Sequence, residues 1–210
     1  MPKQQQRSQE TKDLILKAVC NRLLLDSSED LRIVDICEDT GLSATGIYSY
    51  FGSRRGIVDA AFIKLYQDQH DLLRNVIAHQ LSVSESTEGF MSNMLKIRTE
   101  SFDTLKTFRN LEVIINARAI TYDDFCQLFK PVKTQCLEEL SMVVENFRDK
   151  GFFDSKFSSK QLALTLLGGI MLRGIHEITL GTEDINPTWS LLMSSFGASQ
   201  PLNSQTPPLL

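Results

Sequence analysis

Apolar residues recur every three or four positions along the stretch from Thr11 to Leu25. Residues with that period lie on one face of an amphipathic helix. A polar run from Asp26 to Asp30 follows and has the composition of a turn. The sequence therefore predicts a first helix over residues 11–25, with a broad buried face formed by Leu14, Ile15, Ala18, Val19 and Leu23.

Two short helices with a tight turn between them are predicted next. The first spans Ile33–Thr40 and is predicted to bury Val34, Ile36 and Cys37. Gly41 ends it, because glycine adopts the left-handed backbone of a helix terminus at little cost. Ser43 can cap the second helix, Ala44–Tyr50, because a serine hydroxyl accepts a hydrogen bond from an unpaired N–H of the first turn.

This pair of helices, joined by Thr40-Gly41-Leu42-Ser43, has the spacing of a helix-turn-helix, in which the second helix enters the major groove of DNA. Gly52 and Ser53 interrupt the pattern again, and Ser53 can cap a longer fourth helix that continues toward Ile77. The pattern predicts a compact three-helix head joined by a long helix to the rest of the chain.

Beyond the polar linker 82–89, the pattern stays helical. Pro131 is predicted either to break the helix near Lys130 or to kink it. Pro187 suits the first turn of a helix. The proline-containing tail 197–210 is predicted to be disordered. The predicted helices are 90–105, 109–120, 123–150, 159–180 and 187–196.

The composition supports a globular all-α protein. Hydrophobic residues make up 42% and charged residues 23% of the 210 positions, which is close to the globular average. Six prolines and 11 glycines are too few for a sandwich or barrel with many tight turns. No apolar run spans a bilayer and the first residues lack the apolar segment of a secretory signal, so we expect a cytoplasmic protein without a membrane partner.

No motif in the sequence indicates an enzyme, a metal or a cofactor. Cys20, Cys37, Cys126 and Cys136 are widely spaced and form no Cys-x-x-Cys pair, so we expect reduced and mostly buried thiols. His70, His79 and His176 belong to no catalytic triad or metal motif. The adjacent acidic pairs 123–124 and 138–139 point apart on a helix and have the character of surface charge.

The net charge of −4 is distributed unevenly. Residues 1–66 hold nine of the 22 basic and nine of the 26 acidic residues, so the whole net negative charge lies in residues 67–210. Lys3, Arg7 and Lys12 face only Glu10 among the first twelve residues. This balance is compatible with an N-terminal region that faces nucleic acid.

Three motifs carry a resemblance to a known family. They are Ile15-Leu16-x-Ala18, then Asp35-Ile36-Cys37-x-x-Thr40-Gly41-Leu42-Ser43, then Ile47-Tyr48-x-Tyr50-Phe51-x-Ser53-Arg54. Residues 9–66 resemble the DNA-binding domain of the TetR family of bacterial repressors. The later region resembles the family only in its helical character and length.

Several positions depart from the family pattern. Ser27 replaces a common glycine, and Arg32 stands where a threonine often caps the second helix. Cys37 and Thr40 replace small alanines. Gly46 replaces a hydroxyl side chain that Thr45 beside it can supply. These departures concern local capping and target sequence.

A DNA-binding surface follows from the residues and from the resemblance. Ile47 and Phe51 are four residues apart and are predicted to pack into the head, which leaves the other side of the helix facing outward. The resemblance implies phosphate contacts for Tyr48, Tyr50 and Arg54, although on chemistry alone the two tyrosines could equally belong to an aromatic core. The full set of predicted DNA-binding residues is Lys3, Arg7, Ser43, Ala44, Thr45, Tyr48, Ser49, Tyr50 and Arg54.

The predicted recognition helix carries no Arg, Lys, Asn or Gln. These are the usual bidentate readers of guanine and adenine. We therefore expect discrimination to rest on small contacts, on phosphate positioning and on DNA shape.

Residues 159–196 are apolar on nearly all sides of the predicted helices. Gly168, Gly169 and Gly174 are unfavourable in a helix, and their benefit would be the close approach of another helix. Together with the resemblance, this pattern predicts a homodimer formed through residues 159–196. The alternative is an intramolecular core.

An effector site is predicted among the middle helices. Its apolar lining would suit a mainly hydrophobic small molecule of unknown identity, and Glu112, Asn116 and Arg118 are the polar groups suited to orient it. For each of these residues, core packing is the competing interpretation. The predicted ligand-binding residues are Met94, Phe102, Phe108, Glu112, Asn116, Phe125, Phe129 and Met171.

Taken together, the sequence predicts a flexible basic arm over 1–8, a helix-turn-helix domain over 9–52, an effector-binding and dimerisation domain over 53–196, and a disordered tail over 197–210. Its predicted function is that of a sequence-specific repressor that binds double-stranded operator DNA and is released by an effector. The alternative is a structural nucleoid or division protein of the same fold that binds DNA without an effector.

Overall fold

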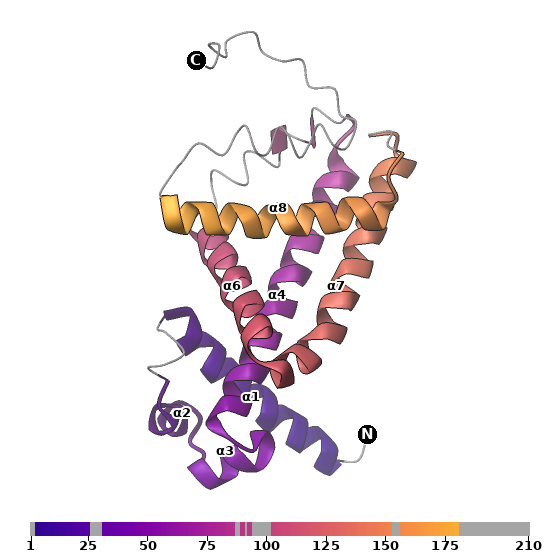
Figure 1. The fold of residues 1–210 in the computed structure, drawn as a ribbon. Helices are drawn as coiled ribbons and strands as arrows, with labels where there is room; N and C mark the ends of the chain where they lie inside the picture. Colours follow the sequence, from indigo (N-terminus) through magenta and orange to yellow (C-terminus); the bar gives the residue numbers. More distant parts are fainter. Residues whose placement is uncertain are drawn as a thin grey trace. The chain divides into compact units, whose positions relative to one another are not determined.

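The computed structural model describes residues 3–25, 31–86, 89–90, 92–93, 102–152 and 156–180. All secondary structure within these ranges is helical, which confirms the all-α fold class (Figure 1). The helices are α1 (Lys3–Leu25), α2 (Ile33–Thr40), α3 (Ala44–Phe51), α4 (Arg54–Val83), α6 (Phe102–Thr121), α7 (Asp123–Asp149) and α8 (Ser159–Leu180). No helix among the described residues is long and apolar enough to cross a membrane.

The chain forms two compact units. Unit 1 comprises Met1–Leu72 and Leu111–Thr134, and unit 2 comprises Leu73–Asn110 and Gln135–Leu210. This division differs from the predicted boundary at residue 52. The reason is that the first half of α4 belongs to the core of unit 1, where Ile57, Ala61 and Leu65 are buried.

α1 begins at Lys3, eight residues before the predicted start, so residues 3–8 are helical and the prediction of a flexible arm is wrong for them. The stretch Lys3–Arg7 consists of residues with high helix propensity. Side-chain bonds one turn apart support this segment. Gln6 donates to Glu10 over 3.1 Å and Gln9 donates to Asp13 over 2.8 Å.

α2 has the predicted bounds but only part of the predicted buried face. Ile36 is 1% exposed, Cys37 is half-buried, and Val34 is 59% exposed. Val34 lies two residues from Ile36, roughly 200° around the helix, so the two side chains cannot face the same core. The prediction that Val34 is buried is wrong.

α6 corrects a further prediction, and α7 excludes one of the two outcomes predicted at Pro131. A break was predicted between Leu105 and Arg109, whereas α6 is continuous from Phe102 to Thr121, because no glycine or proline interrupts it. Likewise, α7 continues through Pro131 without a break. Pro131 lies on the exposed side of α7, where water can satisfy the carbonyl that proline leaves without a donor.

The core of unit 1 is formed by α1, α2, α3, α4, α6 and α7. Its fully buried side chains include both aromatic and β-branched residues, which pack tightly because few rotamers are open to them. The least exposed are Ile15, Val19, Ile47, Ala61, Tyr66, Ile115 and Phe125, each 0% exposed.

The core of unit 2 has an aliphatic part and an aromatic part. Leu140, Val143 and Val144 of α7 pack with Leu162, Ala163 and Leu167 of α8. The aromatic part contains Phe90, Phe147 and Phe152, with the rings of Phe90 and Phe147 edge to face at 4.6 Å.

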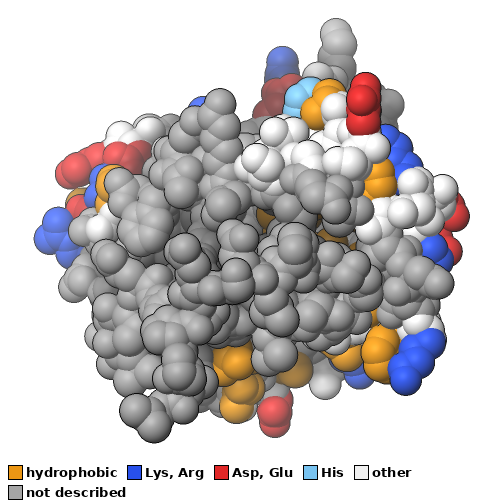
Figure 2. All heavy atoms as spheres, turned by 90° about the horizontal axis from the view of Figure 1, so that it is seen from above, with side chains coloured by type: hydrophobic (Ala, Val, Ile, Leu, Met, Phe, Trp, Pro, Cys, Tyr) orange, Lys and Arg blue, Asp and Glu red, His pale blue; other side chains and the backbone are white. Residues whose placement is uncertain are grey.

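On the face seen in Figure 2, the described side chains around the rim include acidic, basic and apolar groups. The predicted helix 187–196 and the predicted tail 197–210 lie outside the described residues.

Candidate nucleic-acid interface and buried polar cluster

The turn between α2 and α3 is fixed by local hydrogen bonds. Gly41 has φ 71° and ψ 12°, a left-handed conformation that glycine adopts without strain, and its N–H donates to Cys37 O over 2.8 Å. The Thr40 hydroxyl donates to Ile36 O over 2.6 Å. Ser43 Oγ accepts from Gly46 N over 3.1 Å, as the sequence predicted for the cap of α3.

α3 has a buried side and an exposed side. Ile47 is 0% exposed and anchors the helix in the head. Thr45 and Ser49 are exposed, whereas Tyr48 is half-buried. The Ser49 hydroxyl donates to Gly46 O over 2.6 Å, so its proton is already used within the helix. The exposed side therefore offers one hydroxyl donor at Thr45 and an acceptor oxygen at Ser49.

The aromatic end of α3 contacts α1 within the head. Phe51 is half-buried, and Lys12 Nζ lies 5.8 Å from the centre of its ring. The rings of Tyr50 and Phe51 are 6.5 Å apart. Ala44 and Tyr50 are half-buried, and Ser43 is exposed.

Arg54, a predicted phosphate contact, lies at the first residue of α4. Its Nε donates to Leu31 O over 2.7 Å, a contact within the head that the sequence did not indicate. Ser53 Oγ accepts from Gly56 N over 3.0 Å and caps α4, as predicted. Arg54 therefore fixes the chain before α2 against the start of α4.

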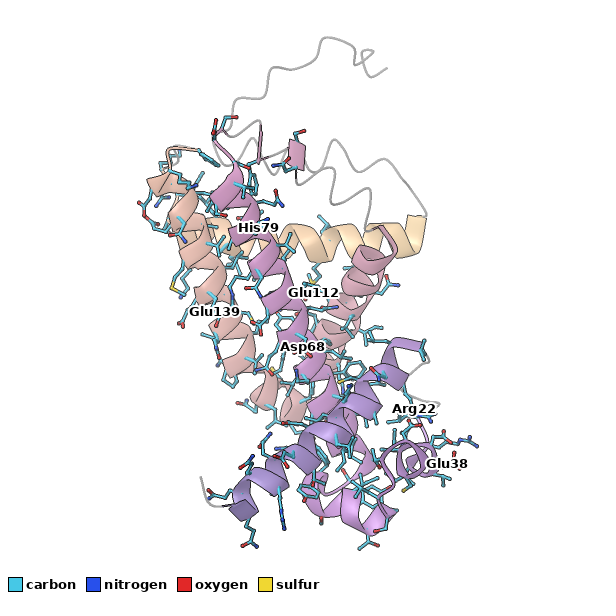
Figure 3. All side chains as sticks on the ribbon, turned by 180° about the vertical axis from the view of Figure 1, so that it is seen from behind. Arg22, Glu38, Asp68, His79, Glu112 and Glu139 are labelled. Atoms are coloured by element: carbon cyan, nitrogen blue, oxygen red, sulfur yellow. The ribbon has the colours of Figure 1, made fainter. Side chains whose placement is uncertain are left out.

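An ion pair joins α1 to α2. Arg22 Nε lies 2.5 Å from Asp39 Oδ2 and its Nη2 lies 2.8 Å from Asp39 Oδ1, a bidentate geometry (Figure 3 labels Arg22). This hydrogen bond from Arg22 lowers the pKa of the Asp39 carboxyl. Arg32 precedes α2 without a side-chain cap and instead pairs with Asp35, with Nη2 to Oδ1 at 2.9 Å.

Lys3 and Arg7 lie in the first turns of α1. Arg7 is exposed, and its carbonyl accepts from the Thr11 hydroxyl over 2.9 Å. Only the backbone of Lys3 is described.

A buried ion pair links α4 to α6 within unit 1. Asp59 is 4% exposed, and its Oδ1 lies 2.6 Å from Arg118 Nε and 2.5 Å from Arg118 Nη2. The Arg118 guanidinium also lies 5.1 Å from the centre of the Tyr122 ring. Arg55 pairs with Asp124 at the start of α7. Arg118, predicted as a group that orients a ligand, thus has partners within the chain.

Three helices of unit 1 each contribute an aromatic or polar pair spaced by four residues. The pairs are Tyr66 and His70 on α4, Glu112 and Asn116 on α6, and Phe129 and Lys133 on α7. We call these six residues the three-helix cluster.

The side chains of the three-helix cluster contact one another. The ring of Tyr66 lies 4.2 Å from that of His70 and 4.7 Å from that of Phe129. His70 Nε2 is 3.6 Å from Glu112 Oε2, and Asn116 Nδ2 donates to Glu112 Oε1 over 3.0 Å. Lys133 donates to Asn116 Oδ1. The buried Glu112 carboxylate thus contacts His70 of α4 and Asn116 of α6, and Lys133 of α7 reaches it only through Asn116 (Figure 3 labels Glu112).

The predicted ligand-binding residues divide between the two units. Glu112, Asn116 and Phe129 belong to the three-helix cluster, and Phe125 stacks on Phe129 at 5.7 Å. Met171 is half-buried on α8 in unit 2. Met94 lies outside the described residues, and of Phe102 and Phe108 only the backbone is described.

Sequence reasoning missed Tyr66, His70 and Lys133 as cluster residues. The signal that could have identified them is the repeat of an i, i+4 pair on three separate helices, because such pairs share a helix face. The missing information was which faces meet, and that depends on packing between elements far apart in the chain.

The cysteines offer no metal site. All four are free, and Cys20 and Cys136 are buried. Burial, together with the Asp68 carboxylate, raises the pKa of the Cys20 thiol to about 11. Among the described residues, no group of three or more His, Cys, Asp or Glu could hold a metal ion.

Solved structures with the same fold are known. A TetR-family transcriptional regulator from Mesorhizobium loti superposes with a TM-score of 0.64 at 13% identity, covering 90% of this chain and 93% of that chain. A TetR regulator from Haloarcula marismortui gives 0.63 at 15% identity, covering 90% and 97%. A transcriptional regulator from Saccharomonospora viridis, in complex with choline, gives 0.59 at 17% identity, covering 89% and 95%.

No protein-family model and no curated protein matches the sequence. At these identities the structural likeness establishes the fold. The chain has the all-helical fold of TetR-type regulators.

Proposed function

We propose that this protein is a sequence-specific DNA-binding transcriptional regulator of the TetR family. The observation that carries the proposal is the geometry of α2, the turn and α3. Ile47 anchors α3 in the core, and Ser43 caps its start. The opposite side of α3, with Thr45 and Ser49, is exposed and can enter a major groove. The fold shared with TetR-type regulators supports the same conclusion.

The exposed side of α3 determines how the protein would read DNA. Thr45 can contact a base edge or a thymine methyl, and Tyr48 and Tyr50 can donate to phosphates through their hydroxyls. Bidentate readers are absent from α3. Recognition therefore rests on phosphate positioning and on DNA shape, with Arg54 holding α4 in place.

Selection of duplexes from a randomised library by the purified full chain tests this proposal. An enriched motif should emerge, and its affinity should fall steeply with salt because phosphate contacts release counterions. Tyr48→Phe and Tyr50→Phe should weaken binding while leaving the fold intact. Lys130→Ala, which removes an exposed charge on α7, is the control. Absence of any enriched motif would overturn the proposal.

α8 supports a homodimer as the functional form. Leu164, Gly168 and Leu172 are spaced by four residues and form an exposed stripe, with Leu164 58% and Leu172 47% exposed. A Cβ added at Gly168 would meet nothing within 4 Å, so the position is open to a neighbouring helix. A two-fold dimer through this stripe would let two heads bind two half-sites.

Sedimentation velocity tests the dimer. Leu172→Glu should shift the protein to monomer because it places a charge in an apolar interface. Gln127→Glu adds the same charge at an exposed polar position of α7, away from this stripe, and should leave the dimer unchanged. A dimer that survives Leu172→Glu would contradict an interface at this stripe.

A repressor released by a small molecule is the mode of regulation we favour. The Saccharomonospora viridis neighbour is in complex with choline, so the fold accepts a small ligand. In this chain, Glu112 and Asn116 are buried in the three-helix cluster, which also holds the edge-to-face rings of Tyr66 and Phe129, so a few polar groups lie among aromatic ones. Such a ligand would have to compete with His70 and Lys133 for these polar groups.

A screen for small molecules that release the selected duplex tests the effector and separates the two modes of action. If the protein has an effector, the effector should lower its affinity for DNA, because the two sites are coupled. Asn116→Ala should weaken this response and leave the DNA affinity without effector unchanged. A structural DNA-binding protein of the same fold should respond to none of the compounds.

A further inference from the structure

The first turns of α1 extend beyond its buried part. Residues 4–10 are exposed, whereas Ile15 and Val19 are fully buried. Lys12 lies between these two regions and contacts the Phe51 ring at the end of α3. The seven residues from Lys12 back to Gln5 add about 10 Å of helix beyond this contact.

One face of this extension is in register with Lys12. Gln5 and Ser8 precede Lys12 by seven and four residues, so all three lie on the side that continues the buried face of α1 toward its N-terminus. We call these three residues the α1 face. Its polar groups are an amide, a hydroxyl and an ammonium, and each can donate a hydrogen bond.

The acidic residues of this segment lie elsewhere on the helix. Glu10 lies roughly 160° and Asp13 roughly 100° around from Lys12. Each accepts an amide hydrogen bond, from Gln6 and Gln9 respectively. The α1 face therefore carries positive charge with no carboxylate in register with it. Arg7 points roughly 140° away from Lys12, so it does not belong to this face.

We infer that the α1 face binds the sugar–phosphate backbone of DNA that flanks the major-groove segment entered by α3. This inference rests on the proposed function. Two observations carry it: Lys12 makes the face continuous with α3 through Phe51, and the charge of the face is complementary to phosphate. The contact supplies a positive charge for phosphate, which α3 lacks because its exposed side chains are short and uncharged.

The assignment differs from the one drawn from sequence. Lys3 and Arg7 were the predicted basic contacts of the N-terminus, within residues 1–8 that were predicted to form a flexible arm. Because residues 3–25 are one helix, the side chains are fixed around its axis, and Gln5 and Lys12 face the α3 side instead.

Binding to duplexes with and without flanks tests the α1 face. The full chain is titrated with two versions of the selected operator, one carrying flanking base pairs and one trimmed to the outer edge of each half-site. Gln5→Glu should weaken binding to the long duplex by about tenfold, the scale of one hydrogen bond to a charged group, and should have little effect on the trimmed duplex. Lys12→Met should reduce the salt dependence of binding by about one phosphate contact.

Gln4→Glu is the matched control, because it makes the same change at an exposed position one residue along and about 100° around the helix. It should weaken binding to both duplexes to the same small extent. If Gln5→Glu gives this pattern too, the α1 face is not a flanking contact and the inference fails. A wild-type chain that binds neither duplex above a scrambled sequence overturns the proposed function, and this contact with it.

Discussion

The two units differ in what their cores contain. Unit 1 buries charge and amide groups, with Asp59 4%, Glu112 5% and Asn116 9% exposed. The described core clusters of unit 2 consist of aliphatic and aromatic side chains. A buried ion pair restricts two helices to one register, because a slip leaves a desolvated charge without its partner. Unit 1 thus contains the helix-turn-helix together with the core whose buried polar contacts require one register of the helices.

Serine side chains accept hydrogen bonds from backbone N–H groups at helix starts and turns in both units. Ser43 and Ser53 in unit 1 each accept from the N–H of a glycine three residues later. In unit 2, Ser158 accepts from Gln161 N over 3.2 Å, and the Gln161 side chain accepts from Ser158 N over 2.9 Å. Ser86 of unit 2 accepts from Gly89 N over 3.1 Å in the same way, so the serine–glycine pair is common to both units, and α8 differs by its reciprocal box.

The largest expected effect comes from breaking the buried pair of unit 1. Asp59→Ala leaves the largely buried Arg118 without its main partner and should reduce the free energy of unfolding by about 3–5 kcal/mol. Asp124→Ala, which removes a carboxylate 65% exposed, should cost less than about 1 kcal/mol. Urea denaturation measures both. Equal small losses would show that unit 1 does not depend on this pair.

An apolar truncation probes the core of unit 2 in the same way. Leu162 is 2% exposed, and Leu162→Ala should cost about 2–4 kcal/mol through lost burial and a residual cavity. Thr165→Ala, at an exposed position of the same helix, should change stability by less than about 0.5 kcal/mol. A loss at Leu162 as small as that at Thr165 would mean that this core is loosely packed.

The turn before α4 offers a smaller and sharper test. A Cβ at Gly56 would lie 2.2 Å from the Phe51 carbonyl oxygen, so the end of α3 would have to shift. Gly56→Ala should therefore destabilise by about 1–3 kcal/mol despite the better helix propensity of alanine.

Gly46→Ala is its matched control. A Cβ at that position lies 3.3 Å from Ser43 Oγ, a contact that a shift of this side chain by a few tenths of an ångström can relieve, so we expect little change in thermal stability. If both variants unfold at the same temperature, the approach of Gly56 to Phe51 does not constrain the turn.

Local chemistry made unit 1 the more predictable region. The cap by Ser43, the end of α2 at Gly41 and the burial of Ile47 all depend on residues within four positions of one another. The helical extension of α1 to Lys3 was missed because amphipathic periodicity detects only the part of a helix that is buried. Residues 4–10 are exposed on all sides and therefore carry no such signal.

The partners of buried polar groups could not be predicted. Glu112 and Arg118 stand out in the sequence as polar residues in apolar surroundings. Their partners, His70 for Glu112 and Asp59 for Arg118, lie more than 40 residues away. Pairing at that separation depends on how α4 and α6 pack. The sequence therefore indicated that polar groups are present in this core and left open what they bind.

The smallest expected effect is a difference between two exposed carboxyls, one in each unit. A hydrogen bond from Arg22 lowers the pKa of Asp39, and a hydrogen bond from the Ser159 hydroxyl lowers that of Glu145. A lowered native pKa stabilises the fold above the unfolded pKa of each carboxyl, and this contribution is lost as the pH falls below about 4.

Arg22→Met and Ser159→Ala should each return the respective pKa toward its ordinary value in a carbon-13 NMR titration. High salt should raise the pKa of Asp39 more than that of Glu145, because the main donor to Asp39 is charged and the main donor to Glu145 is neutral. Equal salt responses would indicate that charge contributes no more to the α1–α2 contact of unit 1 than to the α7–α8 contact of unit 2.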